Sequence, residues 1–238
     1  MKRRLKINGA IIAAAVLLVT IFPNIFMRRD TIDLWEETLE IFGIALILLG
    51  QVIRVSARGY KSEYSSKGSI LIQKGPYALV RNPMYLGILL IGLGIVLILF
   101  KWWVICLFAL VFISRYVLLI FKEEKKLLSM FPRDYPDYQR RVPCFLPSIP
   151  TILKRDISEY LPMKLPWVKK EIGSILAVLL FTLLVESWED IKHEGWATYR
   201  EEALTIIITI ILFIAMFMYL SKRTKSIEED DPNKSKSN

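Results

Sequence analysis

Two short segments carry most of the side chains in this chain that could do chemistry. The first runs from Gly75 to Gly87 and reads GPYALVRNPMYLG. Its Arg81 is able to bind a carboxylate or phosphate through two hydrogen bonds. The second begins at Glu123 and Glu124, whose carboxylates can bind a cationic group or accept a proton. Together the two segments predict a site for a charged ligand.

Each segment also has a plainer interpretation. Asn82 precedes a proline and is predicted to cap a helix, with Pro83 at the first helical position. Arg81 would then be an arginine at a membrane interface. Glu123 and Glu124 are predicted to end an apolar helix, where they oppose the helix dipole and could form a solvated charged turn. The aromatic residues that follow are more often packing than ligand contacts.

An almost uninterrupted apolar block, from Leu86 to Phe121, separates the two segments. Lys101 divides it into two apolar runs, the second of which also carries Arg115, so the block is predicted to be a tight helical hairpin with Lys101, Trp102 and Trp103 at one membrane interface. A hairpin returns the chain to the edge from which it started. The two segments are therefore expected to lie side by side.

The composition is that of an integral membrane protein. The chain has 238 residues, of which 54% are hydrophobic, and a mean hydropathy of +0.41. Because lipid tolerates no unpaired backbone, the predicted fold is all-α, a polytopic bundle of about six transmembrane helices. The predicted spans are Gly9–Met27, Leu34–Val55, Met84–Phe100, Trp102–Phe121, Trp167–Trp188 and Ala203–Leu220.

Breaks in this pattern divide the chain into four parts. Prolines at 143, 147, 150, 162 and 166 block long helices, and the last 18 residues are charged and almost without apolar groups. The predicted parts are an N-terminal transmembrane helix (1–33), a core (34–147), a proline-rich connector with a C-terminal helix pair (148–220) and a disordered charged tail (221–238).

The basic residues predict the orientation. If the N-terminus is cytoplasmic, the inner segments hold 25 of the 32 lysines and arginines, as the positive-inside rule requires. Both termini, and the pocket between the two segments, are then cytoplasmic. The net charge of +9 reflects topology and contact with anionic lipids. No nucleic-acid partner is expected, because no basic stripe lies on a soluble module.

Histidine and cysteine usage excludes several kinds of site. His193 is the only histidine, so clustered-histidine iron or zinc sites and a Ser-His-Asp triad at the two segments cannot be built, and no metal is expected. Cys106 and Cys144 form no CxxC motif, and no disulfide is expected.

In combination, the motifs resemble the isoprenylcysteine carboxyl methyltransferase and phospholipid methyltransferase group of membrane methyltransferases. That group has a G-x-Y-x-x-x-R-H-P-x-Y segment, a hydrophobic hairpin, a Glu-Glu pair and then F-G-x-x-Y-x-x-Y before V-P. Here the corresponding sequences are GPYALVRNPMYLG, the hairpin, and EEKKLLSMFPRDYPDYQRRVPCFLP. The resemblance covers about residues 40–147 and implies S-adenosylmethionine as the cofactor.

The resemblance also assigns roles to individual residues. The positions that would contact the cofactor are Ile70, Leu71, Ile72, Tyr77, Asn82, Pro83, Met84, Tyr85 and Glu123. The residues that would take part in catalysis are Arg81, Glu123, Glu124 and Arg115. Three positions depart from the pattern: Asn82 replaces the histidine, Pro132 replaces the glycine, and apolar Leu119 stands where prenylcysteine enzymes place an arginine that binds the substrate carboxylate.

The implied activity is transfer of a methyl group, in line, to a lipophilic acceptor that enters from the bilayer. The preferred acceptor atom is a carboxylate or hydroxyl oxygen of an isoprenoid- or polyketide-like molecule. Two alternatives stay open: N-methylation of a phospholipid amine, and a family member that has lost activity. A carboxylate nucleophile needs no base, whereas a phenol or amine needs a proton acceptor, for which Glu123, Glu124 and Tyr85 are the candidates.

Overall fold

The computed structural model describes residues 18–19, 21–28, 34–65, 70–148, 156–178, 207–208, 211 and 214–224, with side chains in the third of these segments from residue 38. Its helices are α2 (Pro23–Phe26), α3 (Leu34–Tyr64), α4 (Pro76–Leu79), α5 (Pro83–Leu99), α6 (Trp102–Met130), α7 (Asp134–Arg141) and α9 (Ile157–Tyr160). Residues 165–178 and 214–224 are also helical. The described part contains no strand beyond one isolated bridge between Met27 and Phe100, so the all-α prediction is confirmed.

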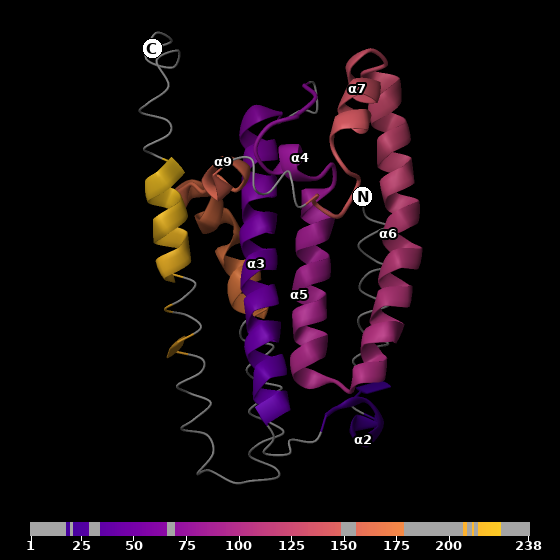
Figure 1. Ribbon diagram of the computed structural model, residues 1–238, viewed down its shortest axis with the longest axis vertical. Coiled ribbons are helices and arrows are strands. Elements are labelled where there is room, and N and C mark those ends of the chain that lie inside the picture. Colours follow the sequence, from indigo (N-terminus) through magenta and orange to yellow (C-terminus); the bar gives the residue numbers. More distant parts are fainter. Residues whose placement is uncertain are drawn as a thin grey trace.

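The centre of the molecule is a row of three long helices, α3, α5 and α6, each antiparallel to its neighbour (Figure 1). Two glycines let α3 and α5 approach closely. A Cβ on Gly50 would lie 2.7 Å from the carbonyl oxygen of Gly87, and a Cβ on Gly87 would lie at the same distance from that of Gly50. Such contact between backbones is how helices pack where lipid removes the hydrophobic driving force.

The predicted hairpin is formed by α5 and α6, joined through Phe100 and Lys101. The connection lies against α2, which lies at the same end of the bundle (Figure 1). The backbone N–H of Lys101 donates to the carbonyl of Phe26 at 3.0 Å, and its Nζ donates to the carbonyl of Asn24 at 2.6 Å. The hairpin returns the chain to the opposite end, where α4 and α7 lie.

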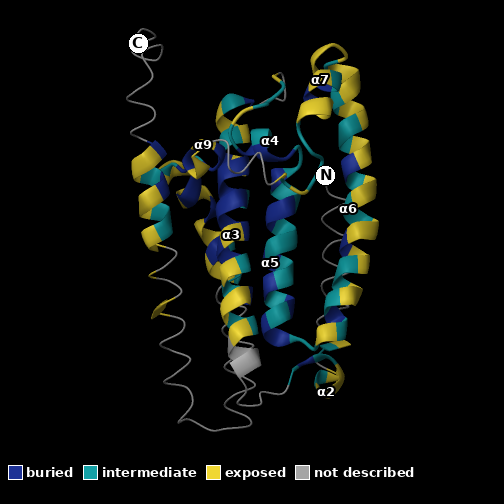
Figure 2. Ribbon diagram, in the orientation of Figure 1, coloured by how far each residue is buried: buried dark blue, intermediate teal, exposed yellow. Residues whose placement is uncertain are grey.

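Two helices, α3 and α6, are long and apolar enough to cross a membrane, and α5 is a shorter apolar helix of 17 residues. In Figure 2, α5 is mostly buried or half-buried, whereas α6 exposes one side along its length. The exposed side carries large apolar residues, among them Leu110, Ile113, Leu118 and Phe121. A face of this kind suits contact with lipid.

Two predicted helix ends were wrong. Helix α3 continues nine residues past Val55 to Tyr64, and α6 continues nine residues past Phe121 to Met130. Both extensions are polar, so hydropathy alone stopped too early. At the N-terminus, the predicted helix from Gly9 to Met27 is interrupted at Phe22, because Pro23 lacks an N–H and begins the separate helix α2. Of the span 9–27, only 18–19 and 21–27 are described.

Residues 156–178, which begin with α9, pack on α3, on the side away from α5 (Figure 1). Its apolar residues Tyr160, Leu161, Trp167 and Ile175 share one core with α3, α4 and α5. Polar contacts fix the position, since Glu63 accepts from Trp167 Nε1 at 3.0 Å and from Lys164 Nζ at 2.9 Å. The remainder of the predicted spans 167–188 and 203–220, with His193 and residues 225–238, lies outside the described residues. Residues 221–224, predicted to begin the disordered tail, are instead helical, and the Arg223 side chain donates to Asp156 at 2.7 Å.

Candidate functional site

A cavity of about 340 Å³ opens at the end of the bundle where α4 and α7 lie. Six parts of the chain line it: the end of α3, residues 70–72, α4, the turn before α5, the polar extension of α6, and α7. The lining residues are Lys61, Ser65, Ile70, Leu71, Ile72, Tyr77, Arg81, Lys122, Glu123, Lys126, Leu127, Met130 and Tyr138. The volume is in the range of small-molecule sites.

The two segments singled out in the sequence meet at this cavity. The hydroxyl of Tyr85, in the first turn of α5, donates a hydrogen bond of 2.7 Å to Oε1 of Glu123 on α6. The ring of Tyr85 also packs on Tyr116, with 5.2 Å between ring centroids. The bond from Tyr85 fixes the orientation of the Glu123 carboxylate.

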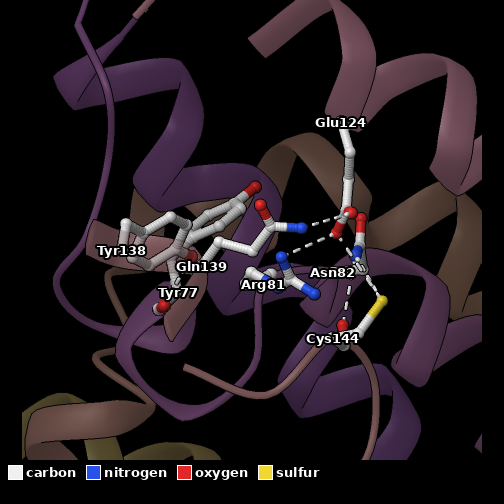
Figure 3. A network of polar contacts seen from close by, with 7 residues as sticks. All are labelled: Tyr77, Arg81, Asn82, Glu124, Tyr138, Gln139 and Cys144. Carbon is white, nitrogen blue, oxygen red and sulfur yellow. Dashed lines mark hydrogen bonds and ion pairs between the residues drawn. The ribbon is translucent and has the colours of Figure 1, made fainter. Parts of the chain in front are cut away.

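Beside it, Arg81 and Glu124 form the centre of a second polar network (Figure 3). Nη1 of Arg81 lies 3.3 Å from Oε1 of Glu124, and both side chains are about nine-tenths buried. Gln139 of α7 donates to Oε2 of Glu124 at 3.5 Å, and the Cys144 thiol lies 3.6 Å from Oε1. Asn82 donates to the carbonyl of Cys144 at 3.1 Å. One carboxylate thus ties α6, α7 and the segment after α7 to the turn before α5.

Helix α7 and the residues after it cover one side of the cavity. The Tyr138 hydroxyl donates to the carbonyl of Tyr77 at 2.7 Å, and both residues are drawn in Figure 3. The N–H of Arg81 donates to the carbonyl of Pro143 at 2.9 Å. Arg141 donates to the Gln73 side chain at 3.0 Å. These bonds hold the cover against α4 and the segment before it.

The tyrosines of the site are held as neutral phenols. Burial, and then the charge of Glu123, raises the pKa of Tyr77 above its ordinary value. Burial, and then the Glu124 carboxylate, raises the pKa of Tyr135 to about 12. Tyr138 is shifted in the same direction, chiefly by burial, which raises its pKa. Near neutral pH these hydroxyls donate hydrogen bonds and carry no charge.

Several residues predicted to contact a ligand do line the cavity, namely Ile70, Leu71, Ile72, Tyr77, Arg81 and Glu123. The others lie next to it: Tyr85 touches Glu123, and Asn82 and Glu124 belong to the network around Arg81. Pro83 is buried at the first position of α5, as predicted, and Met84 follows it half-buried. Arg115 is eight residues before Glu123 on α6, about 12 Å away along the helix.

Two local predictions were wrong. Asn82 stands at the N-cap position of α5, but its side chain caps nothing, because it donates to Cys144 instead. Glu123 and Glu124 do not end their helix. Helix α6 runs six residues beyond them to Met130, which moves both carboxylates away from the unfavourable end of the helix dipole. The apolar face that continues through Leu127 explains the extra turns.

Sequence reasoning missed several lining and network residues: Lys61, Ser65, Lys122, Lys126, Met130, Gln139 and Cys144. A signal existed for Lys122 and Lys126, which flank Glu123 at a spacing of four and so lie on one helix face. No local signal marked Lys61, because its place depends on the unpredicted extension of α3.

The model of the family described as "Phospholipid methyltransferase" matches residues 39–134, which include both segments, the hairpin and most of the cavity. Over residues 39–134 the chain is similar to the phospholipid methyltransferase family. The two helices able to cross a membrane, α3 and α6, lie almost wholly within the matched segment.

Curated relatives are similar over different parts of the chain. Protein-S-isoprenylcysteine O-methyltransferase from Schizosaccharomyces pombe is 32% identical over 115 residues, 45% of this chain and 49% of the relative. Nickel-cobalt-cadmium resistance protein NccN from Alcaligenes xylosoxydans xylosoxydans is 26% identical over 194 residues, 72% of this chain and 88% of the relative. Cobalt-zinc-cadmium resistance protein CzcN from Cupriavidus metallidurans is 32% identical over 115 residues, 47% of this chain and 49% of the relative. The chain thus spans about half the length of the first and third. No solved structure matches it.

Proposed function

We propose that this chain is an integral membrane methyltransferase that binds S-adenosylmethionine in the cavity beside Glu123 and methylates a lipophilic acceptor. The observation that carries the proposal is the arrangement of Arg81 and Glu123. The two residues are far apart in the sequence and of opposite charge, and they line one cavity within the segment that the family model matches.

The charged and apolar side chains that line the cavity suit this cofactor, which joins a sulfonium, an ammonium and a carboxylate to an adenosine. The Glu123 carboxylate attracts the cationic groups. Arg81 would hold the carboxylate, since it is the arginine of the cavity lining and its Nε completes no hydrogen bond, while its Nη1 pairs with Glu124. Tyr77, with Ile72 and Leu127 in the same lining, offers an aromatic and apolar surface for the base.

When bound, the cofactor supplies a methyl group already activated by its sulfonium. The residues around it must orient the reactants and exclude water, and orientation alone can supply about 7–11 kcal/mol of a barrier. Tyr85 fixes the Glu123 carboxylate, and Glu124 fixes Arg81. A carboxylate acceptor needs nothing more. A hydroxyl acceptor needs a proton acceptor, and Glu123 is in place for that role.

The preferred acceptor is therefore a carboxylate or hydroxyl oxygen on an isoprenoid- or polyketide-like molecule. N-methylation of a phospholipid amine is the second candidate, favoured by the description of the family whose model matches. Asn82, in place of the family's histidine, favours a third, an inactive member that keeps the fold. We further propose that the predicted spans 9–27, 167–188 and 203–220 also cross the membrane and that both termini are cytoplasmic.

The test is a calorimetric titration in which S-adenosylmethionine is added to the purified full-length protein in detergent. We expect saturable binding, weakened at least about tenfold in Glu123→Gln because a charge-assisted contact is worth about 1.5–3 kcal/mol. Asp134→Asn is the matched control, since this exposed carboxylate at the start of α7 does not line the cavity. Absence of binding by the folded protein would refute the proposal.

If binding is seen, labelled methyl transfer into membrane lipids identifies the acceptor class. Base-labile label indicates an ester and supports the oxygen acceptor. Label retained in a phospholipid head group supports the amine acceptor. Binding without transfer to any lipid supports the inactive member.

A further inference from the structure

Cationic side chains outnumber carboxylates in the cavity lining. Lys61, Arg81, Lys122 and Lys126 carry positive charge, and Glu123 is the single carboxylate among the lining residues. The lysines come from two helices, Lys61 from the last turn of α3 and the other two from successive turns of α6. They converge on one space although more than 60 residues separate them in the sequence.

Arg81 and Glu123 have functions that account for their charges, but the three lysines do not. Arg81 is paired with Glu124, and Glu123 is held by Tyr85. Among residues 38–65, 70–148 and 156–178, no ion pair reaches Lys61, Lys122 or Lys126. All three are exposed at the cavity and free to meet an anion from outside.

The cofactor does not balance this charge, because its two cationic groups and one carboxylate give it a net charge of +1. Its carboxylate would be held by Arg81, which lines the cavity and whose Nε completes no hydrogen bond. With the cofactor bound, the charge of the three lysines would therefore still be uncompensated. Surplus charge of one sign in a cleft attracts a ligand of the other sign.

The position of the lysines indicates what kind of anion fits. The exposed apolar face of α6 runs to Phe121, which is 65% exposed, and Lys122 follows immediately. A molecule whose apolar chain lies in the bilayer along α6 would present its polar head at the level of Lys122 and Lys126. Leu127 and Met130 extend apolar surface into the cavity beside them.

Resting on the proposed function, we propose that the acceptor is an anionic amphiphile, and that Lys61, Lys122 and Lys126 bind its carboxylate or phosphate at the mouth of the cavity. The lysines select the acceptor by charge and hold its head beside the cofactor. A carboxylate bound there would itself be the nucleophile. A phosphate bound there would be part of a head group methylated at another atom.

Three probes share one alkyl chain and differ only in their head groups: laurate, dodecyl phosphate and dodecanol. Comparing them distinguishes recognition of the charged head from binding of the apolar chain. Each is titrated into the full-length protein in a neutral detergent, with the cofactor present and absent. We expect laurate, dodecyl phosphate or both to bind at least about tenfold more tightly than dodecanol. Binding of laurate alone supports a carboxylate acceptor, and binding of dodecyl phosphate alone supports a phosphate.

Single substitutions Lys61→Gln, Lys122→Gln and Lys126→Gln are expected to weaken binding of the anionic probe about two- to fivefold each, as partly exposed ion pairs do. The triple variant should lose at least about tenfold. Lys125→Gln is the matched control, because Lys125 is next to Lys126 on the same helix and does not line the cavity.

Equal binding of dodecanol would overturn the inference, and so would a loss in Lys125→Gln as large as in Lys126→Gln, since general attraction to anionic lipid does not distinguish the two. Cofactor affinity, measured on the same samples, reports the folded state of each variant. Normal cofactor binding without charge selection would refute this inference alone, whereas loss of cofactor binding by the unsubstituted protein would refute the proposed function.

Discussion

The hydroxyl of Tyr85 donates to Glu123 across 38 residues of sequence and joins the first turn of α5 to α6 at the cavity. Tyr85→Phe keeps the ring against Tyr116 and removes this bond. We expect the free energy of unfolding to fall by about 1.5–3 kcal/mol, the usual cost of losing a hydrogen bond to a charged group. Denaturant titration in detergent measures it.

A double-variant cycle with Glu123→Gln isolates the pair. If the bond is the shared cause, Tyr85→Phe with Glu123→Gln will cost less than the sum of the two single substitutions. Strict additivity would show that the two side chains act independently.

The Arg81–Glu124 pair is buried, so removing one partner leaves the other charge without compensation. Glu124→Gln is expected to lower the free energy of unfolding by about 3–5 kcal/mol. Gln139→Ala is the control, since that residue is exposed and its 3.5 Å contact is long. It should cost less than about 0.5 kcal/mol. Thermal unfolding of the two variants under the same conditions measures the difference. A similar loss of stability in both would argue against a buried ion pair.

Close packing of α3 on α5 depends on the missing side chain at Gly50. Gly50→Ala forces a Cβ to 2.7 Å from the Gly87 carbonyl and 2.9 Å from the Ile91 backbone nitrogen, so the backbones of the two helices must move apart. We expect a loss of about 1–3 kcal/mol, as in other overpacked cores. Gly173→Ala is the matched control, because a Cβ there meets nothing within 4 Å and alanine favours a helix. Equal unfolding midpoints for the two variants would contradict this account.

Alkaline pH should destabilise the site through its buried phenols. The pKa of Tyr135 is about 12 in the folded protein and about 10 when unfolded, so its contribution is complete below pH 10. Between pH 10 and 12 the unfolded state loses a proton that the folded state keeps, and the free energy of unfolding falls.

Tyr135→Phe should flatten this fall while changing little at pH 7, where the buried hydroxyl completes no hydrogen bond. Unfolding midpoints of both proteins from pH 8 to 12 provide the measurement. Parallel curves for the two proteins would show that Tyr135 is not responsible.

The parts of the fold visible in the sequence were those set by hydropathy and proline. The hairpin around Lys101 and the start of α5 at Pro83 are confirmed because a charge between two apolar runs, and a proline after Asn82, act locally. The ends of α3 and α6 were not predictable in this way. Their last turns are polar and are held by contacts with α7 and with residues after 156, such as the bonds of Glu63 to Lys164 and Trp167.

The site residues also fall into two groups, those that the sequence predicted and those that it did not. The motif arginine and the glutamate pair could be found from residue types, and the hairpin argument predicted that they would meet. The use of Asn82 could not be found, since its amide turns to a carbonyl 62 residues away. Lys61 joins the lining only because α3 extends to Tyr64.

The docking of Trp167 on α3 bears on the order in which the protein is made. The ring of Trp167 occupies the space that a side chain at Gly59 would need, and it bonds to Glu63 one turn later. Ribosomes deliver α3 about a hundred residues before that ring emerges. During this interval the apolar side of α3 that Trp167 later covers must contact lipid or an insertion factor instead. A chain that ends after Pro147 lacks Trp167, so this side of α3 would stay uncovered.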